Sequence, residues 1–214
     1  MPYLGETPAV GSRSKLNATT TVGTAAEEDT LIKFDGNAQD FHIGLDDSAD
    51  DLVIGLGSAL GTTTHMSFDE AGVVSMPLQP GCWVRRASVQ SINHATETTV
   101  NWDTEEYDTN NDFDNSTNYR FTAPEDGFYL ALAHVSFNIA QDKYIALDFR
   151  INGTQKSIIN NASAVANHTT TTITGVFNLD ATDYLYLQAY HVHGSALNLT
   201  AGVAWSQMHV HKLA

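Results

Sequence analysis

The chain has 214 residues, of which 42% are hydrophobic and 9% aromatic, enough to build the core of one or two β domains. Its 10 Lys and Arg residues are outnumbered by 25 Asp and Glu residues, which gives a net charge of −15. This charge argues against nucleic acid and anionic membranes as partners, because phosphate groups are bound by clustered cations.

Residues 1–29 contain several Pro and Gly residues, few large apolar side chains and a Thr-rich tract at Thr19–Thr21. Such a segment buries too little surface to fold alone, so it is either a tail or an arm that becomes ordered against a partner. We favour the arm, since an arm that precedes repeats resembles the attachment segment of phage virion fibres. We expect no signal peptide and no membrane insertion, because the segment lacks a basic start with an apolar stretch and no run of the chain approaches ~18 apolar residues.

Residues 30–76 contain an internal repeat with the pattern apolar-x-apolar-turn. Its first apolar positions are Ile32, Ile43, Ile54 and Met66, at intervals of 11, 11 and 12 residues. Short alternating strands at this spacing, separated by Asp and Gly, predict a β meander. One copy has too little core to be stable, so its faces must be buried against other copies. An intertwined three-chain β prism or spiral would meet this need.

The segment 30–57, TLIKFDGNAQDFHIGLDDSADDLVIGLG, is similar to segments of tail-fibre and virion proteins of marine phages. The similarity implies a location in the virion. Two acidic pairs, Asp46-Asp47 and Asp50-Asp51, lie between copies of the repeat. Paired carboxylates can bind calcium or perform acid–base chemistry. We interpret these ones as solvated turns that keep strand edges from pairing wrongly.

Residues 77–82 contain two prolines and a glycine, which predict a linker between the meander and a head domain at residues 83–214. Cys82 is the only cysteine, which excludes an intrachain disulfide. It precedes Trp83 at the start of an expected strand, and no nearby cation or helix start would lower the pKa of its thiol. We therefore expect Cys82 to be a small buried hydrophobic residue.

Within the head, residues Thr117–Tyr129 read TNYRFTAPEDGFY. We expect an aromatic-bearing strand, a turn at Pro124–Gly127 and a second apolar strand at Phe128–His134. Proline pre-sets φ for such a turn, and glycine adopts the positive φ that closes it. Two strands joined in this way are expected to form an antiparallel pair.

Several short motifs of the head follow the pattern of a known family. They are Phe113-Asp114, Thr117, Phe121, Ala123-Pro124, Gly127-Phe128-Tyr129, Leu147–Gly153, Phe177-Asn178-Leu179 and Thr182–Leu187. With these motifs, residues 83–213 resemble the globular domain of complement component 1q and its relatives, which share a jelly roll with the tumour necrosis factors. Asn118 and Thr182 depart from the pattern, since the family usually has Gly there. The resemblance implies a jelly-roll sandwich, and the absence of a preceding Gly-x-y run indicates that the chain is not the complement subunit itself.

Residues 103–114 form the most acidic loop of the head. Four oxygen-bearing side chains alternate in it, as in the first half of an EF-hand loop: Asp108, Asn110, Asp112 and Asp114. Phe113 stands where an EF-hand needs Gly, and Tyr119 stands where it needs Glu, so an EF-hand is excluded. A looser calcium site remains an alternative, because clustered oxygen ligands suffice for this ion.

Two His-x-His pairs, His191/His193 and His209/His211, fall on expected strands. Alternate residues of a strand point to one face, so each pair would present two imidazoles together. On a three-fold axis, one pair per chain would supply six nitrogens, which suits iron, nickel or zinc. Phage fibres that resemble this architecture use His-x-His in this way. His209 and His211 are the better candidates for such a divalent metal, and the alternative is hydrogen-bonded strand histidines without metal. We expect no required cofactor.

The sequence contains no catalytic motif: no Gly-x-Ser-x-Gly, no His-Glu-x-x-His and no phosphate-binding Gly-rich loop. We therefore expect binding and not catalysis. Tyr107, Tyr144 and Tyr190 lie near the ends of expected strands and are candidates for ligand binding, since exposed aromatic rings of this kind stack on sugar rings.

These features predict an all-β homotrimer with an attachment arm, a β-repeat stalk and a jelly-roll head. The predicted function is that of a phage fibre protein, joined to other virion proteins by its N-terminal part. Its head would bind a host-surface glycan or protein through several weak sites acting together. One alternative is a capsid decoration or tail scaffold protein without a receptor, and another is a secreted, lectin-like bacterial adhesin.

Overall fold

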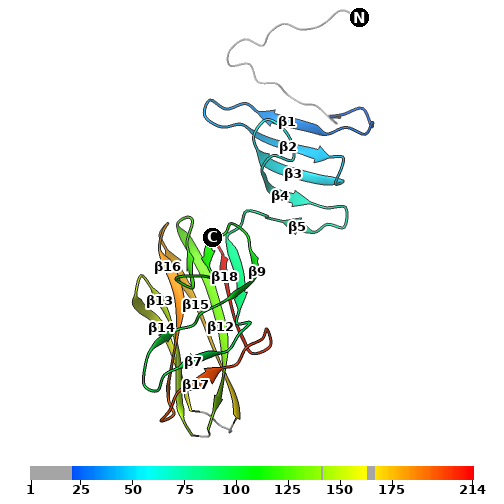
Figure 1. The fold of residues 1–214 in the computed structure, drawn as a ribbon. Helices are drawn as coiled ribbons and strands as arrows, with labels where there is room; N and C mark the ends of the chain where they lie inside the picture. The colour runs from blue at the N-terminus through cyan, green and yellow to red at the C-terminus, as the bar shows by residue number, and fades with distance from the viewer. Residues whose placement is uncertain (1–20, 141, 163–166) are drawn as a thin grey trace, which may run out of the picture. The chain divides into compact units, whose positions relative to one another are not determined.

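The computed structural model describes residues 21–140, 142–162 and 167–214, which form strands, turns and bends (Figure 1). Within these ranges there is no helix, and so none that could cross a membrane. The all-β fold expected from the sequence is confirmed. The chain divides into two compact units, Met1–Pro77 and Leu78–Ala214. Residues 1–20, which make up most of the predicted arm, lie outside the described ranges.

The first unit contains a five-stranded antiparallel sheet in which each strand pairs with the next along the chain. Its strands are β1 (Thr30–Phe34), β2 (Phe41–Asp46), β3 (Asp51–Leu56), β4 (Thr64–Phe68) and β5 (Val74–Ser75). The first four coincide with the four copies of the repeat, so the predicted meander is confirmed.

The register of this meander follows the repeat. Ile32 pairs with Ile43, Ile43 with Ile54, and Ile54 with Met66. The equivalent position of each copy therefore lies in one row across four strands. Because side chains alternate between the two faces of a sheet, all four members of this row point to the same face.

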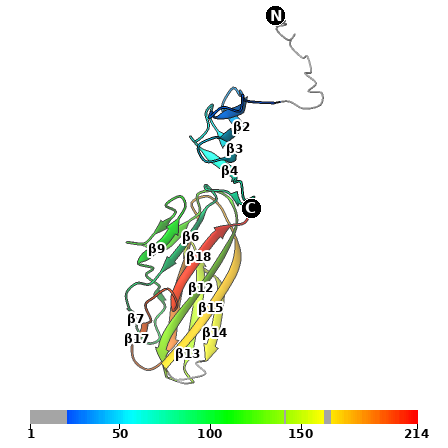
Figure 2. The same ribbon diagram turned by 90° about the vertical axis from the view of Figure 1, so that its right-hand side faces the viewer.

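The second unit is a sandwich of two sheets (Figures 1 and 2). The six-stranded sheet contains β10 (Phe113–Asp114), β11 (Arg120–Thr122), β16 (Tyr184–Val192), β13 (Tyr144–Ile151) and β14 (Thr154–Ala162) in this order, with β8 (Thr98–Thr99) on β16. The seven-stranded sheet contains β7 (Gln90–Ile92), β17 (Leu197–Leu199), β12 (Gly127–Ile139), β18 (Ser206–Lys212), β6 (Gly81–Arg85) and β9 (Thr104–Asp108), with β15 (Asn167–Leu179) on β12. Strand β6 thus begins inside the segment predicted as a linker.

Alternate side chains of both sheets meet in one hydrophobic core. The largest fully buried side chains include Trp102, Tyr129, Phe121, Phe137 and Phe149. Cys82 is fully buried as well, and burial raises the pKa of its thiol well above the ordinary value. A thiol that stays protonated in an apolar environment is unreactive, so the sequence-based expectation for this residue is confirmed.

The turn at Pro124–Gly127 does not join an antiparallel pair, and this part of the sequence-based prediction is wrong. β11 pairs with β10 and β16, whereas β12 pairs with β15, β17 and β18 of the other sheet. The backbone groups on the two sides of the turn have different partners. Ala123 N–H donates to Asp183 O (2.8 Å), and Phe128 N–H donates to Ala214 O (2.8 Å). The turn therefore crosses from one sheet to the other.

Thr182 lies in the turn before β16 with a φ of 74°, a left-handed conformation that a β-branched residue rarely adopts. This is one of the two positions where the family that residues 83–213 resemble usually has Gly. At the other, the positive φ falls on Tyr119 (53°) and not on Asn118.

We expect Thr182→Gly to raise the free energy of unfolding by about 0.5–1 kcal/mol, because glycine removes the Cβ strain at the cost of some backbone entropy. Urea unfolding of the full chain measures the change. Thr172→Gly, at an exposed position of the regular strand β15, is the matched control and should be destabilising. Destabilisation by both substitutions would contradict the strain argument.

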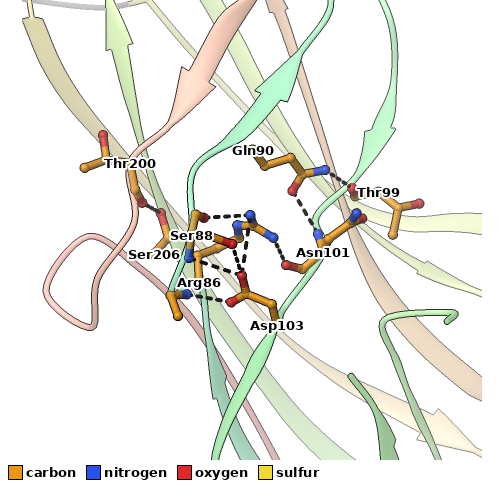
Figure 3. Close-up of polar contacts among 9 residues, drawn as sticks. Arg86, Ser88, Gln90, Thr99, Asn101, Asp103, Thr200 and Ser206 are labelled. Atoms are coloured by element: carbon orange, nitrogen blue, oxygen red, sulfur yellow. Dashed lines mark hydrogen bonds and ion pairs between the residues drawn. The ribbon is translucent and has the colours of Figure 1, made fainter. Parts of the chain in front are cut away.

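A buried arginine holds together the segments that follow β6 and precede β9 (Figure 3). Arg86 is 4% exposed, and its guanidinium donates to the backbone oxygens of Ser88 (2.6 Å) and Asn101. Asp103 Oδ2 lies 3.8 Å from Arg86 Nη2. The same carboxylate accepts hydrogen bonds from the N–H groups of Ala87 (2.5 Å) and Ser88 (3.1 Å). The two side chains thus bind four backbone groups of these segments.

Two further side chains extend this network. Gln90 accepts a hydrogen bond from Asn101 N–H (2.9 Å) and donates one to Thr99 O (2.8 Å). Ser206 Oγ donates to Thr200 O (2.8 Å), as Figure 3 also shows. The chain between β7 and β9, in which only the two residues of β8 pair with another strand, is therefore fixed largely by side chains.

Candidate ligand-binding site

Tyr144 and Tyr190 come together on the outer surface of the six-stranded sheet. Strands β13 and β16 pair so that Ala146 lies opposite Tyr190, which brings Tyr144 next to it on the diagonal. The two rings meet edge to face, with centroids 5.8 Å apart. Both side chains point outward because their neighbours Ile145 and Ala189 are buried in the core.

The two tyrosines border a hollow of about 450 Å³, which we call the tyrosine hollow. Its lining is apolar on one part (Tyr144, Ala146, Ile158, Tyr190 and Val192) and polar on the other (Glu97, Asp148 and Gln155). Apolar and aromatic walls with a few fixed polar groups are the usual composition of a small-molecule site.

The polar part of the tyrosine hollow is held in place by Arg150. Its Nε donates to Asp148 Oδ2 (2.8 Å), and its Nη2 donates to Glu97 Oε2 (2.7 Å). Gln155 Nε2 donates to the same oxygen of Asp148 (3.0 Å). Asp148 Oδ1 accepts no side-chain hydrogen bond from the described residues. The polar groups are thus preorganised, and one carboxylate oxygen remains for a ligand.

Asp148 is only 6% exposed. Burial raises the pKa of its carboxyl, and the hydrogen bonds from Arg150 and Gln155 oppose this rise. The charged form therefore depends on Arg150. With Glu97 and Asp148 both ionised, one cation balances two anions, and the tyrosine hollow carries a small negative charge that suits an uncharged, hydroxyl-rich ligand better than an anionic one.

A second, shallower depression of about 210 Å³ lies along the same strand β16. Arg120 is placed over the ring of Tyr184, with Cζ 4.1 Å from the ring centroid. Tyr184 in turn stacks on Tyr186 at a centroid distance of 6.2 Å. Because Arg150 pairs in register with Tyr186, the two depressions adjoin. Together they form an aromatic and polar strip along the outer face.

Tyr107 lies elsewhere. It is on β9 of the other sheet, and its hydroxyl is 2.7 Å from His211 Nε2. Of the three tyrosines predicted as ligand-binding, the structure brings two together and separates the third. The sequence-based prediction did not include Asp148, Arg150, Gln155 or Tyr186. The sequence YLYLQAY at residues 184–190 could have indicated this strip, because its alternation places every second side chain on one face of the strand.

The two His-x-His pairs differ in environment. His209 and His211 both point outward from β18, and their rings are nearly parallel (23°) at 6.4 Å. Trp83 stacks on His209 at 5.2 Å. Burial lowers the pKa of both histidines, so both are mainly neutral at pH 7. Parallel rings do not direct their nitrogens to one point, and the described residues contain no group of three or more ligand side chains arranged for a metal ion. A metal on this pair stays a prediction that requires histidines from several chains.

His191 and His193 do not form an outward pair. His191 is fully buried, with Nε2 2.9 Å from Ile92 O. His193 lies beyond the end of β16 and is half-buried. The two rings do lie close together, with centroids 6.5 Å apart, but this strand turns its odd positions toward the core, so the pair is not presented to solvent as a whole.

The acidic loop uses its carboxylates to cap its own backbone. Asp108 accepts hydrogen bonds from the N–H groups of Asp112 (3.0 Å) and Phe113 (2.7 Å). Asp114 accepts them from Ser116, Thr117 and Asn118. These bonds hold the pKa of Asp114 well below its usual range. These bonds account for Asp108 and Asp114, whereas Asp112 Oδ2 is buried and has no hydrogen-bond partner among the described residues, so a looser calcium site stays a prediction.

No protein-family model matches the chain, and no curated protein does. Solved structures do match. Eiger TNF from S. frugiperda has 10% identity and a TM-score of 0.51, covering 64% of this chain and 93% of its own. Murine APRIL at pH 5.0 has 13% identity and a TM-score of 0.50, covering 63% and 99%. The globular domain of zebrafish complement 1qA protein has 13% identity and a TM-score of 0.49, covering 64% and 98%. The first two similarities show the fold, so the predicted jelly roll is confirmed.

Proposed function

We propose that this chain is a non-enzymatic fibre protein of a phage virion. It works as a homotrimer that is joined to other virion proteins by its N-terminal part and binds a host-surface glycan with its jelly-roll unit. The observation that carries the binding role is the tyrosine hollow, with two aromatic rings beside the fixed polar group of Arg150, Asp148, Glu97 and Gln155.

The chemistry of the tyrosine hollow suits a sugar. A pyranose ring presents C–H groups on its faces, which pack on tyrosine rings, and hydroxyl groups at its edge. Asp148 Oδ1 and the amide of Gln155 lie where such hydroxyls can be bound, and Arg150 keeps them in position. The hollow is shallow and open, which favours a few residues of a surface polysaccharide over an enclosed small molecule.

The virion role is supported by the repeats. Four strands in register at near-constant spacing form a short repeat unit of the kind that a fibre stalk requires. A binding unit on a trimeric stalk gains strength from avidity, because three weak sites on one fibre bind a dense surface far more tightly than one. The net charge of −15 keeps such fibres soluble and apart from nucleic acid.

Tyr190→Ala should reduce glycan binding by the full chain about tenfold per site, since loss of one stacking ring removes roughly 1–1.5 kcal/mol. A glycan array identifies the ligand, and surface plasmon resonance on the immobilised glycan measures the loss. Asp148→Asn should weaken binding without changing the shape of the hollow. Tyr107→Ala is the matched control and should bind as the wild type does.

Unchanged binding by Tyr190→Ala would show that the ligand lies elsewhere on the chain. If the wild type binds no glycan and no host cell but is recovered in purified particles, the alternative of a capsid decoration or tail scaffold protein holds instead. Recovery in the culture medium of a bacterium without phage would support the adhesin.

A further inference from the structure

One face of the first unit's meander is mainly apolar. We call it the apolar face. It is formed by alternate side chains of β1 to β4, namely Ile32, Phe34, Phe41, Ile43, Leu45, Leu52, Ile54, Leu56, Met66 and Phe68. The row of equivalent repeat positions runs through its centre. Two polar side chains border it: Thr30 at one corner, and His65, whose exposed ring lies 6.0 Å from the ring of Phe41.

The apolar face is open to solvent. Phe34 is 59% exposed and Ile32 48%, and Phe41, Leu45 and Leu52 each exceed 40%. An antiparallel sheet normally turns its apolar face to a core and its polar face to water. Monomeric proteins seldom expose a contiguous apolar patch larger than a few hundred Å². Five side chains at this exposure, together with five that are partly exposed, amount to on the order of 600 Å², close to one side of a standard protein interface.

The opposite face is already closed by its own chain. His42 is 1% exposed, and its Nδ1 lies 3.1 Å from Gly57 O. Its ring covers Gly55, where a Cβ would come within 2.6 Å of His42 Nε2. Lys33 on the same face lies close to Asp35 and Asp40. A partner therefore meets mainly polar groups there, and the apolar face is the one that needs a cover.

We propose that the apolar face is the self-association surface of this chain, and that it is covered by the apolar faces of two further copies, which form a three-sided prism with the central row inside. This inference rests on the homotrimer of the proposed function and names what holds its stalk together. Three properties of the apolar face support this proposal.

The first property is the absence of charge. In a chain of net charge −15, a face without a single ionised side chain offers nothing to a partner that is recognised electrostatically. An identical face meets it without desolvating any charge. The second property is the regular size of the central row, three isoleucines and a methionine, so that copies can pack in the same register.

The third property is that the described part of the first unit supplies little cover for this face, since Val22 is the one residue before β1 that borders it. The only segment of the first unit that precedes the meander and lies outside the described residues is 1–20. Its large apolar residues are Met1, Tyr3, Leu4, Val10 and Leu16, which are too few and too irregularly spaced to cover ten side chains at alternate positions. Further copies of the meander supply apolar faces of the same size and pattern.

Site-specific cross-linking of the full chain tests the proposal. Ile54→Cys places a thiol in the centre of the apolar face, and Ser67→Cys places one on the opposite face of the adjacent strand. The buried Cys82 gives the wild type no background reaction. With a short thiol-specific cross-linker at low protein concentration, we expect covalent dimers from Ile54→Cys and none from Ser67→Cys. No dimers from Ile54→Cys, or equal amounts from both variants, would overturn the proposal.

Light scattering of the wild type gives the number of copies. The expected mass is three times 23.2 kDa. A mass of one copy overturns the association, and a mass of two overturns the three-sided arrangement. Neither measurement depends on the glycan, so loss of binding in Tyr190→Ala with intact cross-linking would refute the ligand site alone. Conversely, glycan binding by a chain of one copy would refute the prism and the homotrimer but leave the ligand site standing.

Discussion

Arg86→Leu should lower the free energy of unfolding of the jelly-roll unit by about 3 kcal/mol, the cost of removing one partner of a buried, hydrogen-bonded ion pair. Arg86 is 4% exposed, and without it the backbone oxygens of Ser88 and Asn101 lose their donors. Asp103 keeps its bonds to Ala87 and Ser88 but loses the neighbouring cation. The effect is placed at the low end of the range because Asp103 is partly exposed and water can solvate it.

All three tryptophans of the chain, Trp83, Trp102 and Trp205, belong to the second unit, so tryptophan fluorescence during urea unfolding of the full chain reports on this unit alone. Arg85→Leu is the matched control. Arg85 is the preceding residue and also has an ion pair, with Glu106, but the pair is near the surface and should be worth less than ~1 kcal/mol. Equal losses from the two substitutions would contradict the structural role of Arg86.

Trp102→Ala should cost roughly 3–5 kcal/mol, because it removes the largest fully buried side chain and leaves a cavity in the core. The fluorescence of Trp83 and Trp205 remains available for the same urea titration. A loss of this size approaches the whole stability of many domains, so we also expect a lower yield of folded protein at 37 °C.

Trp102→Phe separates the packing of this residue from its polarity. The indole Nε1 is buried and has no hydrogen-bond partner among the described residues. Phenylalanine keeps most of the ring volume and removes a buried N–H that gains nothing from burial. The cost should therefore fall to about 1–2 kcal/mol. If Trp102→Phe were as destabilising as Trp102→Ala, the indole N–H would have a role that the packing argument does not include.

The strands could be predicted from the sequence, because alternation is a local property. β12 alternates buried and outward residues along its length, and the four copies of the repeat each became a strand. The pairing of strands is not local. The turn at Pro124–Gly127 has the residues of a hairpin, yet the hydrogen bonds of Ala123 and Phe128 go to segments more than 50 residues away. No signal within the turn specifies those partners.

Strand pairing also explains why the members of the candidate site could be predicted only in part. Tyr107, Tyr144 and Tyr190 are equivalent in sequence terms, since each lies near a strand end. The pairing of β13 with β16 is what joins two of them and excludes the third. His191 and His209 likewise occupy similar His-Val-His motifs, but one strand turns the first histidine inward and the other turns it outward. Which face of a strand meets the core is decided by the other sheet.

The antiparallel register of the meander also determines how many residues can be added to it or removed from it during evolution. Neighbouring strands run in opposite directions, so insertion of one 11-residue repeat would reverse the course of all that follows it. Insertion of two repeats restores the direction and adds two members to the central row. Homologous chains should therefore differ by whole hairpins of about 22 residues. Duplication of such a hairpin would give a longer relative and deletion a shorter one, with no other change to the segments on either side.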